Sequence, residues 1–248
     1  MARESVYTRV VDVLGHRIAA GELVEGDVLN LTQLESAFGV SRTVAREAMR
    51  ELQSLGMITA RRRVGLIVSP MSDWDVLNPM VIRWRLAGPG RDEQLLSLTD
   101  LRSAVEPTAA RLAASDATDT QRDRLLALSE RLVELGRRGL GDTMEYLMLD
   151  VEYHLLLLRA SHNEMLIAFE PAIEATLVGR NELGLTPRDP TPSAVDNHRE
   201  VARAILAGNE DLAEESSRRI VRIVRSELPL QGRAAREHTA GRPAVPAP

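Results

Sequence analysis

Apolar side chains recur at three- and four-residue intervals near the start of the chain, which predicts an amphipathic helix over residues 4–20. The side chains on this face are Val6, Val10, Val11, Leu14 and Ile18. The pattern then predicts two shorter helices over 31–38 and 42–55. Two short strands, 57–60 and 65–69, are expected on either side of an arginine-rich turn. Residues 1–70 are therefore expected to form one domain of three helices and a hairpin.

The pattern changes after residue 92 to long segments rich in leucine and alanine, separated by helix breakers. The expected helices cover 93–116, 119–137, 141–161, 163–184, 192–207 and 210–227. Because no strand alternation appears, residues 92–230 are expected to form an all-α domain of six to seven helices, and the fold as a whole is expected to be mainly α.

Two further segments differ from these domains. The connector 71–91 contains both tryptophans, Trp74 and Trp84, and is too apolar for a free linker. We expect it to contain a short helix and to pack onto a core. The tail 231–248 is polar and contains prolines, which predicts disorder.

Composition excludes several classes of protein. The chain has 248 residues, of which 44% are hydrophobic and 27% charged, and no apolar run approaches the roughly 20 residues of a membrane span. It has no cysteine, so disulfides and thiolate metal sites are excluded. The start of the chain lacks the charged-then-apolar layout of a signal peptide. A cytoplasmic protein without a membrane partner is expected.

Charge is distributed unevenly along the chain. The formal net charge is −5, but residues 42–63 carry six arginines against two glutamates. The chain contains no lysine, so every fixed positive side chain is an arginine, a residue suited to bidentate contact with phosphate or guanine. A local basic face of this kind is what binding to double-stranded DNA requires.

The expected helix at 42–55 places its arginines where DNA contacts would be made. Arg42, Thr43 and Arg46 share the exposed face near its start, while Val44, Ala48 and Leu52 point toward the interior. The N-terminal residues of a recognition helix reach the base edges. The other candidate contacts are the N-cap Ser41 and, in the turn, Arg61, Arg62, Arg63 and Gly65. The alternative is a solvated charged helix beside a basic hairpin, but the whole arrangement favours a winged helix-turn-helix.

Asp150 and His154 lie four residues apart on an expected helix, so carboxylate and imidazole share one face and could hold a cation together. A surface pair is the alternative. Seven leucine and valine residues between 147 and 158 indicate instead that the helix is largely buried, where both groups need partners.

Residues 5–69 resemble the GntR family of bacterial transcription factors. The resemblance rests on Gly39-Val40-Ser41-Arg42-Thr43, on Arg46-Glu47-Ala48 and on Leu55-Gly56-Met57-Ile58. It departs from the family at the second helix, where Thr32 stands in place of a frequent DNA-contacting arginine.

Residues 93–225 resemble the all-helical FCD ligand-binding domain of the FadR-type branch, through Leu101-Arg102-x-x-x-Glu106-Pro107 and the alanine-rich run after it. The resemblance implies a divalent metal, zinc or nickel, held by Asp150, His154 and His198, with Arg102 binding a small carboxylate effector. The fourth histidine of the family is replaced by Ile220. Two interpretations stay open: a three-ligand metal site, which we favour, or a metal-free pocket in which Arg102 and the histidines bind the anion directly.

The connector contains Trp74-Asp75-Val76-Leu77-Asn78-Pro79. Through these residues it resembles the same segment in sugar-acid regulators of this branch, such as galactonate and gluconate repressors. A sugar acid would offer hydroxyls to Asn163 or Asn181, whereas His162 is expected at the surface or at a helix end. We therefore predict a homodimeric, ligand-responsive repressor rather than an enzyme. The alternatives are a metal-dependent enzyme on the helical domain and an effector-independent DNA-binding protein.

Overall fold

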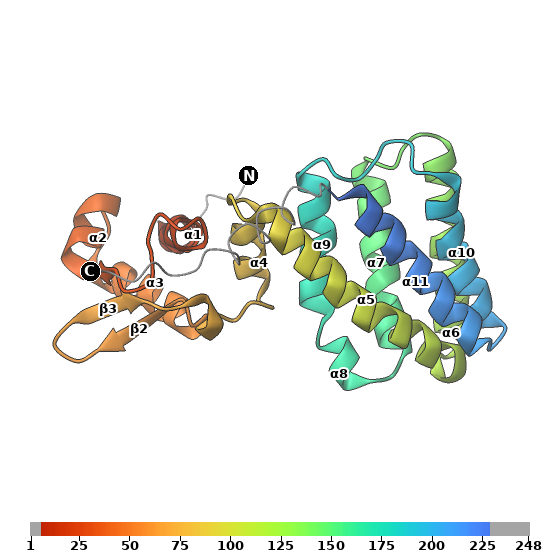
Figure 1. Ribbon diagram of the computed structural model, residues 1–248, viewed down its shortest axis with the longest axis horizontal. Helices are drawn as coiled ribbons and strands as arrows, with labels where there is room; N and C mark the ends of the chain where they lie inside the picture. Colours follow the sequence, from red (N-terminus) through yellow and green to blue (C-terminus); the bar gives the residue numbers. More distant parts are fainter. Residues whose placement is uncertain (1–5, 229–248) are drawn as a thin grey trace, which may run out of the picture. The chain divides into compact units, whose positions relative to one another are not determined.

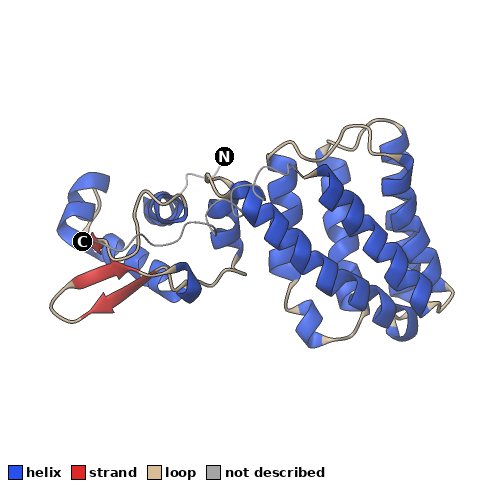
Figure 2. Ribbon diagram, viewed as in Figure 1, coloured by secondary structure: helices blue, strands red, loops and turns tan. Residues whose placement is uncertain are grey.

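The computed structural model describes residues 6–228, which divide into two compact units between Arg91 and Asp92 (Figure 1). Helices dominate both units, and the strands found in the described residues all belong to the first unit (Figure 2). The mainly α fold is therefore confirmed. The tail predicted to be disordered, 231–248, lies outside the described residues.

The first unit begins with three helices and a small sheet. In chain order its elements are α1 (Val6–Ala19), β1 (Val28–Leu29), α2 (Leu31–Phe38), α3 (Arg42–Ser54), β2 (Ile58–Arg61) and β3 (Gly65–Val68). The sheet is antiparallel, and β3 lies between β1 and β2. The sequence did not predict β1, because two residues are too few to show an alternating pattern.

The core of the first unit forms where α1 packs on α3. The predicted apolar face of α1 is buried except at Val6, which is 55% exposed. The prediction for α3 is wrong at Val44, which is only partly buried. Ala45 and Met49 are buried in its place, beside the predicted Ala48 and Leu52. Ala45 and Met49 lie four residues apart, as do Ala48 and Leu52, so the four share one face of the helix and Val44 lies at its edge.

The connector packs on the first unit through both tryptophans. It contains η1 (Met71–Asp73) and α4 (Pro79–Leu86). The Trp84 ring lies so close to Gly15 of α1 that a Cβ there would meet ring carbons at 2.4–2.5 Å, and its Nε1 donates to Asp12 Oδ1 at 2.9 Å. Trp74 Nε1 donates to the Ser69 carbonyl at 3.1 Å. The connector is thus held by packing and hydrogen bonds, as its apolar character predicted.

The second unit is helical throughout its described part. Its elements are α5 (Arg91–Asp116), α6 (Asp119–Arg137), α7 (Met144–Ala160), α8 (Glu164–Ile167), α9 (Glu170–Glu182), α10 (Pro192–Leu206) and α11 (Glu210–Glu227). Helix α6 packs against α7 and α10, α10 also packs against α11, and α7 packs against α9. None of the helices within residues 6–228 combines the length and the apolar character needed to cross a bilayer.

The single helix predicted over 163–184 is wrong, since the chain forms α8 and α9 in its place. Asn163 caps α8, and Pro171 lies in the first turn of α9. A proline ring inside a continuous helix would clash with the carbonyl group four residues earlier, here that of Ile167. The helix therefore stops at Ile167 and starts again at Glu170.

Candidate functional site

The start of α3 presents arginines to solvent. Arg42, Thr43 and Arg46 are all exposed. Ser41 is the N-cap, and its Oγ accepts from the Val44 backbone N–H at 3.4 Å. This capped first turn offers backbone N–H groups together with two guanidinium groups, an arrangement that suits phosphate oxygens and base edges.

Arg42 and Arg46 differ from the nearby Arg50 in that they form no ion pair. Arg50, one turn after Arg46, forms an ion pair with Glu47 at 2.6 Å. Within residues 6–228, no carboxylate lies within ion-pair distance of Arg42 or Arg46. Their charges are therefore available to an external anion.

The turn between β2 and β3 carries the second group of candidate contacts. Arg61, Arg62 and Arg63 are exposed, and Arg61 lies opposite Gly65 across the hairpin. Gly65 has a φ of 118°, in the left-handed region that favours glycine, so the hairpin closes without strain at that position. The hairpin thus presents three arginines in succession.

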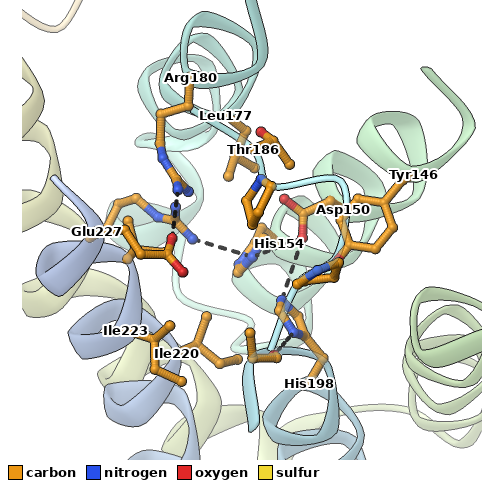
Figure 3. A pocket seen from close by; sticks show the side chains of 15 residues that line it. Tyr146, Asp150, His154, Leu177, Arg180, Thr186, His198, Ile220, Ile223 and Glu227 are labelled. Carbon is orange, nitrogen blue, oxygen red and sulfur yellow. Dashed lines mark hydrogen bonds and ion pairs between the residues drawn. The ribbon is translucent and has the colours of Figure 1, made fainter. Parts of the chain in front are cut away.

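The second unit contains a cavity that brings together side chains from α5, α7, α9, α10 and α11 (Figure 3). Its empty space, with the open mouth included, is about 580 Å³. Its polar side chains are Arg102, Tyr146, Asp150, His154, Arg180, Thr186, His198 and Glu227.

Asp150, His154 and His198 meet on one wall of this cavity, as the resemblance implied. Asp150 Oδ1 lies 3.6 Å from His154 Nε2 and 3.4 Å from His198 Nε2, and one ligand atom from each residue lies within 4.8 Å of the others. His198 Nδ1 lies 2.9 Å from the Ala194 carbonyl, to which it can only donate, so in the neutral ring Nε2 is the acceptor nitrogen. That Nε2 is buried and has no hydrogen-bond partner among the described residues.

His154 is surrounded by charged groups. Its Nδ1 lies 3.2 Å from Glu106 Oε2, and its Nε2 lies 3.2 Å from Arg102 Nη2. Burial opposes the charged form of Glu106, but Arg102 and then His154 outweigh it and lower the pKa of Glu106 to about 2. Burial likewise lowers the pKa of His154, yet Glu106 and Asp150 raise it to about 9. A carboxylate behind a histidine in this way fixes the orientation of the ring.

This donor set fits a divalent transition metal. One carboxylate oxygen and two imidazole nitrogens suit zinc or nickel, and three protein ligands leave positions open to another molecule. Ile220 lines the cavity and is buried, but its side chain offers no donor atom. The described residues therefore provide three ligands, and the resemblance had implied a fourth.

Arg102 is 1% exposed and is held in place by Glu106. Its Nε donates to Oε1 at 2.6 Å and its Nη2 to Oε2 at 3.2 Å. Its Nη1 is buried without a partner among the described residues. An unsatisfied buried N–H group is costly, so Nη1 is the natural donor for a ligand carboxylate.

The two predicted asparagines are not among the cavity-lining residues. Asn163 Oδ1 accepts from the N–H groups of Met165 and Leu166, at 3.0 and 3.3 Å, so its side chain caps α8. Asn181 directly follows Arg180, and on a helix consecutive residues point about 100° apart. His162 is exposed and hydrogen-bonds Gln121, as a surface residue would.

Sequence reasoning missed four polar cavity residues, Tyr146, Arg180, Thr186 and Glu227. Arg180 follows Ile173 and Leu177 at helical spacing, a signal that it lies on the buried face of α9. No comparable signal marks Glu227, which lies in the last turn of α11.

Comparisons with known proteins agree with this division of the chain. Residues 6–68 match the family described as bacterial regulatory proteins, gntR family, and residues 97–222 match the FCD domain. The galactonate operon transcriptional repressor of Escherichia coli is 26% identical over 84% of this chain and 90% of its own length. A probable D-xylose utilization operon transcriptional repressor of Paenarthrobacter nicotinovorans is 26% identical over 87% of this chain and 85% of its own length. Among solved structures, that of Lar from Listeria monocytogenes has the same fold, with a TM-score of 0.62 at 15% identity over 92% of this chain and 98% of its own.

Proposed function

Because the chain belongs to the GntR family of bacterial regulatory proteins and carries an FCD domain, we propose that it is a transcriptional repressor whose operator affinity is changed by a sugar acid. The relatives are DNA-binding regulators, so the function is regulation of transcription rather than catalysis. The observation that carries the proposal is the pair of exposed, unpaired arginines at the start of α3.

In the proposed complex, the first turns of α3 enter the major groove. Arg42 and Arg46 contact base edges or phosphates, and Ser41 and Thr43 contact phosphate oxygens. Arg61, Arg62 and Arg63 hold the backbone, with Gly65 allowing close approach. We propose a homodimer, because a two-fold pair of such helices reads a short palindrome with half-sites on one face of the duplex.

The effector part of the proposal concerns the cavity of the second unit. Asp150, His154 and His198 would hold a divalent metal, which when bound would supply a Lewis acid for a carboxylate. Arg102 would donate to the same carboxylate through its unpartnered Nη1. The names of the two relatives, which refer to galactonate and D-xylose operons, support a sugar-derived effector.

The DNA-binding part is tested by fluorescence anisotropy with the duplex upstream of the protein's own gene and a scrambled duplex of equal length. We expect tighter binding to the native duplex and a strong loss of affinity with salt, because phosphate contacts release counterions. Equal affinity for both duplexes, or binding insensitive to salt, would contradict the proposal.

A further inference from the structure

Arg180 is a second buried arginine in the cavity, and the proposed carboxylate site does not use it. It is 7% exposed, and its Nε is buried without a partner among the described residues. Its Nη2 lies 3.6 Å from Glu227 Oε2 (Figure 3). The same Nη2 lies 3.4 Å from the Leu185 carbonyl. Arg180 thus has an unused donor and a carboxylate neighbour that comes from a different helix.

Glu227 offsets the positive charge of Arg180, whose burial would otherwise be unfavourable. Burial, and then the positive charge of Arg102, lower the pKa of Arg180, while Asp150 and Glu227 act in the opposite direction. The Glu227 side chain is 33% exposed, and burial raises its pKa. A carboxylate in this position reduces the repulsion between two neighbouring guanidinium groups that are largely shielded from water.

The formal charges of the cavity then limit the charge of its ligand. Arg102 is neutralised by Glu106 and Arg180 by Glu227. A histidine that holds a metal is neutral, whatever its pKa without the metal, so a bound divalent cation would exceed the charge of Asp150 by one. This balance matches a ligand with a single carboxylate.

We propose that Arg180 and Glu227 determine the ligand class by contacting the end of the ligand opposite its carboxylate. The cavity then accepts an aldonate and rejects the corresponding aldarate. An aldonate ends in a hydroxyl, which can accept from Arg180 Nε and donate to Glu227. An aldarate ends in a second carboxylate, which Glu227 repels. Tyr146 and Thr186, which also line the cavity, add hydroxyl groups suited to a polyol. This inference rests on the proposed sugar-acid function.

The test is isothermal titration calorimetry of the zinc-loaded full chain with matched ligand pairs. The pairs are galactonate with galactarate, gluconate with glucarate, and xylonate with xylarate, each differing only in oxidation of the terminal carbon. The variant is Glu227→Gln, which removes the charge and keeps the shape. Glu227→Asp keeps the charge, and Glu215→Gln removes a charge from the same helix at a residue that does not line the cavity.

We expect the wild-type chain to prefer at least one aldonate over its aldarate by tenfold or more. Glu227→Gln should abolish or reverse this preference, whereas Glu227→Asp and Glu215→Gln should retain it. If Glu227→Gln increases the affinity for both ligands of a pair equally, or if the wild-type chain prefers the aldarate, the inference is overturned while the sugar-acid function stands. If the wild-type chain binds none of the six ligands, the sugar-acid function itself fails, and this inference with it.

Discussion

The two units of the molecule use arginine in opposite ways. On α3 and in the β2–β3 turn the arginines are exposed, and Arg42 and Arg46 have no carboxylate partner in the described residues. On the surface of the second unit most are paired, as Arg124 is with Glu152 and Arg159 with Glu170. Arg188 and Arg203 are exceptions there, exposed and without a carboxylate partner among the described residues. Because the chain has no lysine, pairing rather than residue type distinguishes these surfaces. The net charge of −5 hides this difference, and the cluster of unpaired arginines at the start of α3 is where we expect a polyanion to bind.

The arginines in the cavity of the second unit combine features of the paired and the unpaired surface arginines. Arg102 and Arg180 each have a glutamate neighbour, yet each keeps one buried nitrogen without a partner. Such a site has donors for a small anion but no surface for a nucleic acid. The comparison therefore separates three uses of one residue type: surface pairing, the proposed DNA contact and the proposed ligand recognition.

The largest effect is expected from Arg102→Ala. This change leaves the ionised Glu106 buried with only His154 beside it, which should cost about 3–5 kcal/mol of unfolding free energy. The matched change Arg124→Ala breaks an exposed pair and should cost about 0–1 kcal/mol. Urea denaturation of both variants measures the difference, and equal losses would remove the distinction between buried and surface pairing.

A smaller effect is expected on DNA binding. Arg42→Ala and Arg46→Ala should each weaken specific binding by about 1–3 kcal/mol, as base-contacting arginines do. Arg50→Ala on the same helix is the control, and its loss should be well below 1 kcal/mol because Arg50 is already paired with Glu47. Anisotropy titrations at one salt concentration compare the three variants. A loss for Arg50→Ala as large as that for Arg46→Ala would show that pairing does not identify the contact residues.

Local patterns allowed much of the fold to be predicted. The periodicity of α2 and α6 gave their bounds, and the four-residue spacing of Asp150 and His154 placed both on one face of α7. The two-residue strand β1 and the break before α9 were missed, because β1 is too short for a pattern and the stop signal at Pro171 was not recognised.

The cavity could be predicted only in part. His198 was placed beside Asp150 through a family resemblance, since the two residues lie on different helices. The Arg180–Glu227 pair depends on how α9 and α11 pack, and nothing local to either residue indicates that packing. Contacts between distant helices are set by tertiary structure, which a single sequence does not display.

The central claim is that a ligand bound in the second unit changes the DNA affinity of the first. The most direct measurement is the affinity of the full chain for its upstream duplex, with and without zinc and the tightest-binding aldonate. The proposal predicts a change of about 5- to 150-fold, the range of common allosteric coupling. Chelation of the metal, or His198→Ala, should abolish this response while DNA binding persists. Unchanged DNA affinity, under conditions where calorimetry shows the aldonate bound, would contradict the claim.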